Sequence, residues 1–499
     1  MVKRKKIPRY KNLINGKLTA PSAEKYFENI NPADNSDIIG LFPLSDSQDV
    51  DKAIDAAVAA FGRWSEITPP KRGEMVYKIG ELLLENQERL AKVIVREMGK
   101  TMPEAMGDIK SSADVAYFMA GEGRRMYGQT SFSALDKRWA LTKRTPVGVC
   151  GLITAWNAPM AIITWKLLPA IICGNTVVLK PSEDTPFTAH LFGELCKEAG
   201  LPDGVVNIVF GKGPETGEVL VRNTKVNLVS FTGSTAVGKL ISQECGRQMK
   251  KCSLELGGKN GVIVMNDAHL DAAAKAVSQG AFSTAGQRCA STSRVFVQKG
   301  IYGVFIEKLL AETKKMKVGP GDDPQTKICP IINRRQFEKI MAHIETAKKE
   351  GTKLLFGGSA LTKGVYAKGN YIEPTVFENA GLKSRLAQEE IFGPVLAVFK
   401  IETLQEAIEK ANDIEYGLTA SIFTKNVDQA LYALEKLQVG CCYVNAPTFG
   451  SEPHMPFGGL KNSGNGQREP GVQALDVFSE WKTIYIDYSA IAQQSQSKD

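Results

Sequence analysis

The fold of this chain is decided by the run VGVCGLIT, residues 147–154. An uninterrupted apolar run of this length is typical of a parallel strand that is buried on both faces. The segment WNAP, residues 156–159, then turns the chain into an apolar helix, and TVVL, residues 176–179, is the next strand. Two further strand patterns follow at 205–209 and 228–231, separated by helical ones. We therefore expect an α/β fold built on a doubly wound parallel sheet.

The length and composition are those of an ordinary soluble protein with more than one core. A chain of 499 residues predicts two or three structural units, and 43% hydrophobic and 23% charged residues are typical globular values. Part of the formal net charge of +8 comes from the four cations at residues 3–6. We interpret these as a solvated basic tail, and because no nucleic-acid-binding motif accompanies them, we expect no nucleic-acid partner.

We expect no metal site, no disulfide framework and no membrane segment. The nine cysteines are scattered, and the only close pair, Cys441 and Cys442, is adjacent and poorly placed for a disulfide or a tetrahedral metal site. None of the four histidines stands at ligand spacing to another. The apolar segment 147–179 is interrupted by Asn, Pro and the charged Lys166, so it is too broken to span a membrane. These features indicate a cytoplasmic protein.

One carboxylate and one thiol stand at the ends of a glycine-rich segment. LELGGK, residues 254–259, contains Glu255, and GQRC, residues 286–289, ends at Cys289. A thiol attacks as thiolate, and a carboxylate within reach can act as general base toward the thiol or a hydrolytic water. Taken alone, Cys289 is more typical of a buried small apolar residue than of a nucleophile, and Glu255 is typical of a carboxylate on the solvated face of a strand.

Three further segments suit a nucleotide. KPSE, residues 180–183, follows a strand, and an acid there can bind a ribose diol while repelling a 2′-phosphate. FTGSTAVGK, residues 231–239, presents backbone amides at the start of a helix, which suits a pyrophosphate. GKGPETG, residues 211–217, misses the dinucleotide-binding fingerprint because its third glycine comes one residue late. Asn157 stands at a strand-to-helix turn, where its side chain can donate to an oxyanion or cap the helix.

Seven motifs in order resemble those of the aldehyde dehydrogenase superfamily, and the resemblance covers about residues 12 to 488. The motifs are WNAP at 156, KPSE at 180, FTGS at 231, LELGGK at 254, GQRC at 286, EEIFGP at 389 and PFGGLKNSG at 456. The resemblance implies an NAD-binding domain, a catalytic domain and a small β element for oligomerisation. It places them at residues 1–124 with 146–257, at 258–462, and at 125–145 with 478–492, followed by a tail at 493–499. A homodimer or homotetramer is implied.

The resemblance implies a role for each catalytic residue. Cys289 attacks the aldehyde carbonyl to form a thiohemiacetal, while Asn157 and the Cys289 backbone N–H stabilise the oxyanion, a contribution of about 3 kcal/mol per donor. Hydride transfer leaves a thioester, and Glu255 activates the water that hydrolyses it. Relatives that release an acyl-CoA typically lack this glutamate, so Glu255 favours a free carboxylic acid as product.

The implied cofactor is NAD, with NADP possible. Lys180 and Glu183 hold the adenosine ribose, Ser234 the pyrophosphate, and Glu390 with Phe392 the nicotinamide end. The whole expected cofactor site consists of Trp156, Lys180, Ser182, Glu183, Gly213, Phe231, Gly233, Ser234, Leu256, Glu390 and Phe392. Glu183 favours NAD by repelling a 2′-phosphate, although some relatives with this residue accept both cofactors.

The expected substrate is a small aldehyde, and similarity to the bacterial and archaeal semialdehyde branch suggests 2-oxoglutarate semialdehyde. Glu183 departs from that branch, which often lacks this acid. Arg288 either pairs with the distal carboxylate of a semialdehyde or forms a structural ion pair. The expected tunnel residues are Ala158, Met160, Trp165, Arg288, Thr448, Phe449, His454 and Phe457. A CoA-acylating dehydrogenase and a non-catalytic cofactor-binding protein are the alternatives.

Overall fold

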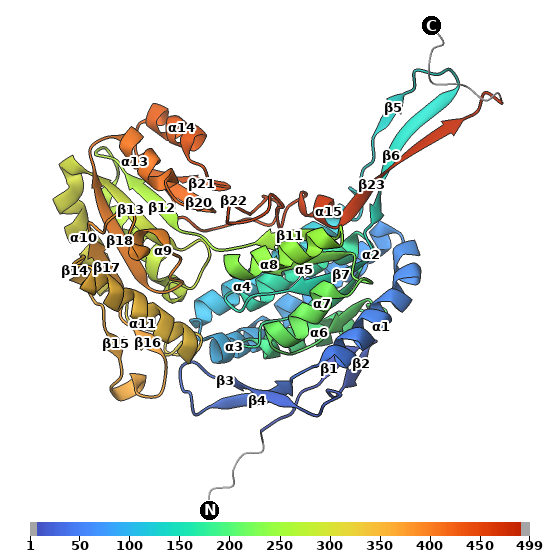
Figure 1. The fold of residues 1–499 in the computed structure, drawn as a ribbon, viewed down its shortest axis with the longest axis horizontal. Coiled ribbons are helices and arrows are strands. Elements are labelled where there is room, and N and C mark those ends of the chain that lie inside the picture. The colour runs from blue at the N-terminus through green and yellow to red at the C-terminus, as the bar shows by residue number, and fades with distance from the viewer. Residues whose placement is uncertain (1–6, 491–499) are drawn as a thin grey trace, which may run out of the picture.

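Two seven-stranded sheets and a projecting arm organise the computed structural model, which describes residues 7–490 (Figure 1). The predicted basic tail at residues 3–6 and polar tail at 493–499 lie outside the described residues. Within 7–490, no helix is long and apolar enough to cross a membrane. The α/β architecture expected from the sequence is confirmed, while the domain boundaries given above stay a prediction.

The first sheet contains the predicted β-α-β unit. Strand β7 (Val149–Ile153) lies parallel to β8 (Thr176–Lys180), and helix α5 (Pro159–Ile172) connects them. The strand order is β11-β10-β7-β8-β9-β1-β2. The other strands are β9 (Val206–Ile208), β10 (Leu228–Thr232), β11 (Lys251–Glu255) and the antiparallel edge pair β1 (Asn12–Ile14) and β2 (Lys17–Thr19). Because β8 and β10 flank β7 on opposite sides, the parallel part of the sheet is doubly wound.

Helices flank this sheet, and buried apolar side chains fill the space between them (Figure 1). They are α1 (Ser47–Glu66), α2 (Pro69–Glu85), α3 (Gln87–Met98), α4 (Met102–Glu122), α6 (Pro186–Glu198), α7 (Glu218–Arg222) and α8 (Thr235–Arg247), with the π-helical turn η1 (Gly213–Gly217). Helix α4 packs along α5, so it brings residues 102–122 toward the later catalytic segments.

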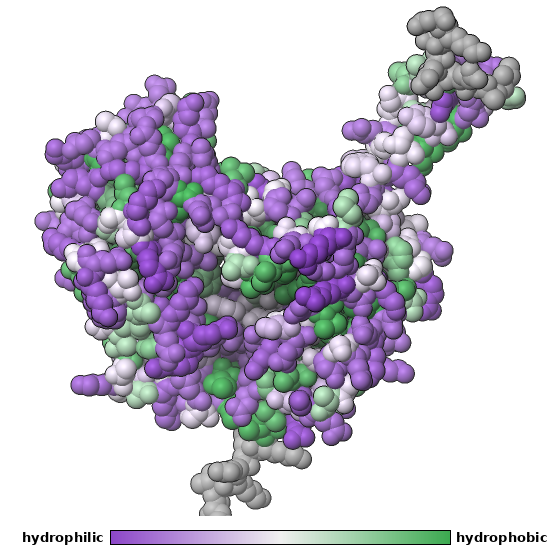
Figure 2. Space-filling view, in the orientation of Figure 1, coloured by the Kyte–Doolittle hydropathy of each residue, from purple (hydrophilic) through white to green (hydrophobic). Residues whose placement is uncertain are grey.

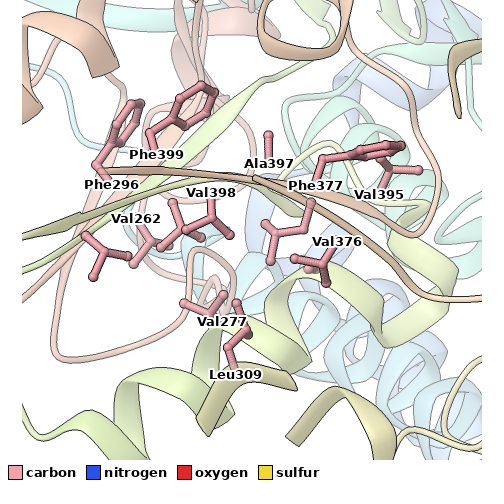
Figure 3. Close-up of a cluster of buried hydrophobic side chains, with 14 of the residues drawn as sticks. Val262, Val277, Phe296, Leu309, Val376, Phe377, Val395, Ala397, Val398 and Phe399 are labelled. Carbon is pink, nitrogen blue, oxygen red and sulfur yellow. The ribbon is translucent and has the colours of Figure 1, made fainter. Parts of the chain in front are cut away.

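The second sheet has the order β14-β17-β18-β13-β12-β20-β21, and only β14 is antiparallel to its neighbour. Its strands are β12 (Asn260–Val264), β13 (Thr292–Gln298), β14 (Lys353–Phe356), β17 (Thr375–Glu378), β18 (Val395–Ile401), β20 (Thr419–Phe423) and β21 (Cys441–Val444). Figure 3 shows its core, where Val262, Phe296 and Val398 project from three neighbouring strands and Val277 and Leu309 from two covering helices.

The elements around the second sheet are mostly helices. They are α9 (Leu270–Phe282), α10 (Tyr302–Lys314), α11 (Arg334–Lys349), α12 (Arg385–Gln388), α13 (Leu404–Asn412), α14 (Val427–Lys436) and the short turns η2 (Ser283–Gly286), η3 (Lys299–Ile301) and η4 (Gly364–Tyr366). Small pairs complete the fold: β3 (Tyr26–Ile30) with β4 (Ile38–Pro43), β15 (Ala360–Leu361) with β16 (Tyr371–Ile372), and β19 (Tyr416–Gly417) with β22 (Leu460–Lys461).

The arm is a three-stranded antiparallel sheet that projects from the body (Figure 1). Strand β6 (Arg138–Pro146) pairs with β5 (Thr130–Phe132) on one edge and with β23 (Ser479–Asp487) on the other; the short helix α15 (Ala474–Val477) precedes β23. Strands β6 and β23, from the two segments that the resemblance assigns to one β element, thus pair with each other. Apolar side chains are exposed along the arm (Figure 2).

Candidate active site

The two sheets meet at residues 256–259, where two glycines permit close approach. A Cβ at Gly258 would lie 2.5 Å from the carbonyl oxygen of Cys289, and a Cβ at Gly257 would lie 2.5 Å from Oε2 of Glu390. The Gly258 N–H donates to Oε1 of Glu390 at 2.9 Å. The LELGGK motif therefore brings the segments of Cys289 and Glu390 against the end of β11, where Glu255 lies.

The turn before Cys289 is tightly constrained. A Cβ at Gly286, which has a φ of +67°, would lie 2.2 Å from the carbonyl oxygen of Gly393. Thr284 and Ala285 also adopt left-handed conformations, with φ of 53° and 54°, which costs on the order of 1 kcal/mol for each non-glycine residue. The buried Gln287 side chain stabilises the turn, because Nε2 donates to the carbonyls of Thr284 and Pro330, each at 3.1 Å.

A buried asparagine fixes the backbone on the other side of the thiol. Asn260, the first residue of β12, donates from Nδ2 to the carbonyl oxygens of Cys289 at 2.7 Å and Ser291 at 2.8 Å, and its Oδ1 accepts from the Thr419 N–H at 3.1 Å. The sequence analysis missed Asn260, although it directly follows LELGGK. An amide that satisfies three backbone groups of two loops is a strong determinant of the Cys289 position.

The Cys289 side chain is half-buried in an apolar cluster with Ala290, Leu418 and Phe457, flanked by Trp165, Phe449 and Cys441. The indole of Trp165 contacts the ring of Phe457 edge-on, with centroids 5.5 Å apart. Burial, together with the nearby carboxylates Glu390 and Glu255, raises the pKa of the Cys289 thiol to about 12. The thiol is therefore protonated at neutral pH in this structure and needs a proton acceptor to attack.

Glu255 is a candidate for that acceptor, because its charge acts on the Cys289 thiol. Its side chain is buried at the end of β11, and neither carboxylate oxygen has a hydrogen-bond partner among residues 7–490. Burial and the charge of Glu469 raise the pKa of Glu255 well above its usual value, against the opposing charges of Lys166 and Arg468. A buried carboxylate without partners and with a raised pKa is typical of a general base.

Behind Glu255 lies a buried charged network that the sequence analysis did not predict. Lys166 and Glu469 form an ion pair of 2.8 Å, each with a side chain 1% exposed. The hydroxyls of Ser230 and Ser253 donate to Glu469 at 2.7 and 2.8 Å, and Lys166 donates to Ser230 at 2.8 Å. The carboxylate of Glu469 is thus held in the interior by an ion pair and two hydroxyl donors.

We predict that Glu469→Gln shifts the acidic limb of the kcat/KM profile to lower pH. Removing this negative charge, and leaving Lys166 positive, favours the ionised form of Glu255, so the pKa of Glu255 falls and the base stays active in more acidic solution. The matched control is Glu97→Gln, which alters another buried carboxylate whose partners are Phe187 and Thr188. An unmoved limb in Glu469→Gln, or an equal shift in the control, would contradict this coupling.

Asn157 lies directly before α5 and is free to act on a ligand. Its predicted alternative role as helix cap is wrong, because the cap position is Ala158 and the first turn is held instead by Asp108, whose Oδ1 accepts from the Ala161 N–H at 2.9 Å. Asn157 is buried, and its side chain makes no hydrogen bond to another residue of the described chain. Its amide is thus available as an oxyanion donor.

The residues expected around a dinucleotide lie along the carboxyl ends of the first sheet. Lys180 donates to Glu183 at 3.2 Å, and Ser182 accepts from the Asp184 N–H at 3.3 Å. Burial raises the pKa of Glu183, but the charge of Lys180, hydrogen bonds to the carboxylate and the charge of Arg335 together outweigh burial and lower the pKa overall, so the carboxylate stays ionised. Ser234 is the N-cap of α8, and its Oγ accepts from the Val237 N–H at 3.4 Å.

The remaining expected cofactor residues have the following contacts. The Trp156 and Phe392 rings meet edge-on at 5.3 Å. Gly233 is required because a Cβ there would lie 2.4 Å from the ring of Phe231. Leu256 packs under α8, Gly213 begins η1, and burial raises the pKa of Glu390. An acid beside a lysine at one end and two aromatic rings at the other fit a nicotinamide dinucleotide.

Two of the residues expected to line the substrate tunnel, Met160 and Thr448, are instead buried in the protein interior. Met160 is wholly buried in the core between α5 and its neighbours, because α5 is apolar on nearly every face and its sequence does not reveal which side meets the ligand. Thr448 is buried behind the thiol, where its hydroxyl donates to the Ala290 carbonyl at 2.7 Å and contacts the Thr292 hydroxyl at 2.9 Å. Met160 therefore packs in the core, and Thr448 supports the backbone beside Cys289.

The other expected tunnel residues have mixed positions. Trp165, Phe449 and Phe457 surround Cys289, and Ala158 caps α5 nearby in sequence. His454 is exposed, with Nδ1 3.6 Å from a carboxylate oxygen of Glu452. The Arg288 guanidinium lies over the Phe449 ring at 4.7 Å and forms an ion pair of 3.3 Å with Glu104. The ion pair that was the alternative for Arg288 is thus present.

Comparison with known proteins identifies this arrangement. The model of the "Aldehyde dehydrogenase family" matches residues 18–484, nearly the whole chain. The chain belongs to the aldehyde dehydrogenase family. It is an NAD(P)-dependent enzyme that oxidises an aldehyde.

Similar aldehyde dehydrogenases have different substrates in their names. The chain is 42% identical to the alpha-ketoglutaric semialdehyde dehydrogenase of Bacillus subtilis, over 96% of this chain and 98% of that protein. It is 41% identical to retinaldehyde dehydrogenase 3 of Rattus norvegicus, over 95% and 92%. The crystal structure of an NAD-dependent aldehyde dehydrogenase from Sinorhizobium meliloti superposes with a TM-score of 0.95 at 37% identity, over 98% of this chain and 97% of that one.

Proposed function

We propose that this aldehyde dehydrogenase oxidises a short aldehyde with a distal carboxylate to the dicarboxylic acid, using NAD. The observation that supports oxidation to the acid is the Glu255 carboxylate, which has no hydrogen-bond partner among residues 7–490 and a raised pKa and whose charge acts on the Cys289 thiol. In the first step, Glu255 accepts the proton of Cys289 and the sulfur attacks the aldehyde carbon. Asn157 and the Cys289 N–H donate to the oxyanion of the resulting thiohemiacetal.

The second half of the reaction uses the same base. NAD, when bound, supplies the hydride acceptor that converts the thiohemiacetal into a thioester. Glu255, having released its first proton to solvent, takes a proton from a water that attacks the thioester carbon. The carboxylic acid leaves, and the sulfur of Cys289 regains a proton. Because Glu255 is present and buried beside the thiol, hydrolysis is favoured over transfer to CoA.

Glu183 supports NAD over NADP. Its ionised carboxylate, held by Lys180, can accept hydrogen bonds from both hydroxyls of an adenosine ribose and repels a 2′-phosphate. Lys180, Glu183 and Ser234 would bind the adenosine and pyrophosphate portion, and Trp156, Glu390 and Phe392 the nicotinamide portion.

Overall similarity does not separate a semialdehyde from a retinal-like substrate, since the two named relatives are equally similar. Two local features favour the semialdehyde, of the class acted on by the Bacillus relative. Arg288 engages Glu104 through Nη2 only, so other guanidinium donors are free for a carboxylate. The Trp165 indole N–H is buried beside Cys289 and has no partner in the described chain, so it suits a polar substrate atom such as a 2-oxo oxygen.

We predict that Arg288→Met selectively weakens oxidation of carboxylate-bearing aldehydes. Loss of a charge-assisted hydrogen bond of roughly 1.5–3 kcal/mol should lower kcat/KM about 10- to 100-fold for 2-oxoglutarate semialdehyde. The kcat/KM for an uncharged aldehyde of similar length should change less than about threefold. NADH formation at 340 nm measures both. An equal loss for the two substrates would exclude Arg288 as the carboxylate-binding residue.

The exposed arm supports a homodimer or homotetramer. Phe132, Trp139, Trp481, Tyr485 and Ile486 expose apolar surface on its three strands, which is typical of a subunit interface. We predict that the protein is oligomeric by light scattering and that Trp139→Glu combined with Ile486→Glu, a cross-strand pair, lowers its mass. Val427→Glu, at an exposed apolar site on α14, is the control. A monomeric wild type would refute this interface.

A cytoplasmic location is also proposed. All nine cysteines are free, including the pair Cys441 and Cys442, which fits a reducing compartment.

A further inference from the structure

The carboxylate of Glu104, in the first turn of α4, connects two segments that are far apart in sequence. Its Oε2 accepts from the N–H of Thr101 at 3.1 Å and from the Thr101 hydroxyl at 2.9 Å, which caps the helix. Its Oε1 accepts from the N–H of Thr284 at 2.7 Å, from the Thr284 hydroxyl at 3.0 Å and from Nη2 of Arg288 at 3.3 Å. One side chain therefore binds the helix start through one oxygen and the segment before Cys289 through the other.

The segment that Glu104 binds has a strained backbone conformation that depends on surrounding contacts. Thr284 and Ala285 are buried, non-glycine residues in left-handed conformations, and such conformations persist only where surrounding contacts enforce them. Gln287 contacts the Thr284 carbonyl, but the Thr284 N–H and hydroxyl are bound by Glu104. Arg288, the residue directly before the thiol, is bound by the same oxygen.

We propose that Glu104 is a positioning residue of the nucleophile. It fixes the turn at 284–285 and the Arg288 side chain, and through them the backbone N–H and sulfur of Cys289 relative to Asn157 and Glu255. The inference rests on the proposed role of Cys289. Geometry of this kind matters because a small displacement of a reacting group can lower a rate by orders of magnitude.

Glu104→Gln is the sharpest substitution. Glutamine has one acceptor oxygen where both carboxylate oxygens now accept from backbone N–H groups, and it has no charge for Arg288. Whichever way the amide turns, its NH₂ group faces a backbone donor, either Thr101 or Thr284. Thr101→Ala tests the alternative that Glu104 serves only as a helix cap, because it removes the hydroxyl contact at Oε2 and leaves the contacts at Oε1.

The first measurement is the rate of Cys289 alkylation by iodoacetamide, followed on the Cys289 peptide by mass spectrometry with saturating NAD. The second is the rate constant of the NADH burst with aldehyde. We expect both to fall on the order of tenfold in Glu104→Gln, with an unchanged NAD dissociation constant, and to stay within about twofold of wild type in Thr101→Ala. Because alkylation needs no turnover, it tests the positioning of the thiol even if the proposed reaction fails.

The matched control is Glu122→Gln, at the other end of α4. Glu122 is also a buried carboxylate, and it pairs with Arg125 at 2.6 Å. A merely structural role for Glu104 predicts that both glutamine variants lower Tm and leave alkylation and burst unchanged, and that result would overturn the proposal. An equal loss in Thr101→Ala would also overturn it in favour of the helix cap. If Glu104→Gln does not fold, Thr284→Val removes the hydroxyl contact alone and is expected to slow both rates about threefold; unchanged rates there would reject the proposal.

Discussion

Cys289→Ala is expected to lower turnover by a factor of about 10⁴ or more, because it removes the thiol that forms the thiohemiacetal. NAD binding should be unchanged, since Lys180 ends β8, Glu183 lies in the turn after it and Ser234 caps α8, all away from the segment of Cys289. Steady-state NADH formation and a fluorescence titration with NAD measure the two quantities.

The matched control for Cys289→Ala is Cys441→Ala. Cys441 packs in the same apolar cluster, so its replacement changes the surroundings of the substrate but not the nucleophile. Turnover of this control should remain within about threefold of wild type. Residual turnover of Cys289→Ala near the wild-type rate would show that Cys289 is not the nucleophile.

Glu255→Gln is expected to give a burst of about one NADH per active site, followed by a steady state roughly 10²- to 10³-fold slower than wild type. Glutamine cannot accept a proton from the hydrolytic water, so the thioester accumulates. The burst should also slow, since the Cys289 thiol, whose pKa is raised, loses Glu255 as its proton acceptor. The steady state falls further, because water is a weaker nucleophile than the thiol. Stopped-flow absorbance at 340 nm resolves both phases.

An added nucleophile tests whether slow hydrolysis of the thioester causes the slow steady state of Glu255→Gln. Hydroxylamine cleaves a thioester without a general base and should restore much of the steady-state rate of Glu255→Gln. CoA should not replace water in the wild type. CoA-dependent turnover that is insensitive to Glu255→Gln would favour the acylating alternative, and two unchanged phases would mean that another group activates the water.

Much of the fold could be predicted because its signals are local. The apolar run of β7, the turn at 156–159 and the strand β8 are contiguous, so their periodicity alone defines a β-α-β unit. Strands β6 and β23 are distant in sequence, but each has strand character, so their pairing could be inferred. The glycines of LELGGK and GQRC could be recognised as motifs. The reason that glycine stands at these positions is close approach to Glu390, Cys289 and Gly393, which only the three-dimensional structure shows.

The parts of the site that could not be predicted depend on long-range contacts. The contact from Glu104 to Thr284 spans 180 residues, and that from Ser253 to Glu469 spans 216. Nothing in the residues around Glu469 distinguishes it from a solvated carboxylate. Met160 was misplaced for a different reason: α5 is buried on almost all sides, so hydrophobicity does not indicate which face meets the substrate.

The buried pair of Lys166 and Glu469 also constrains when a newly made chain becomes an enzyme. The environment that raises the pKa of Glu255 includes Glu469, which leaves the ribosome long after Glu255. At about 5–20 residues per second, the interval is roughly 10–40 seconds of translation. Once Cys289 has also been synthesised, the nascent chain holds the thiol and the base but lacks the carboxylate that pairs with Lys166. Aldehyde oxidation should therefore begin only after residue 469 has emerged and the C-terminal segment has folded onto the first sheet.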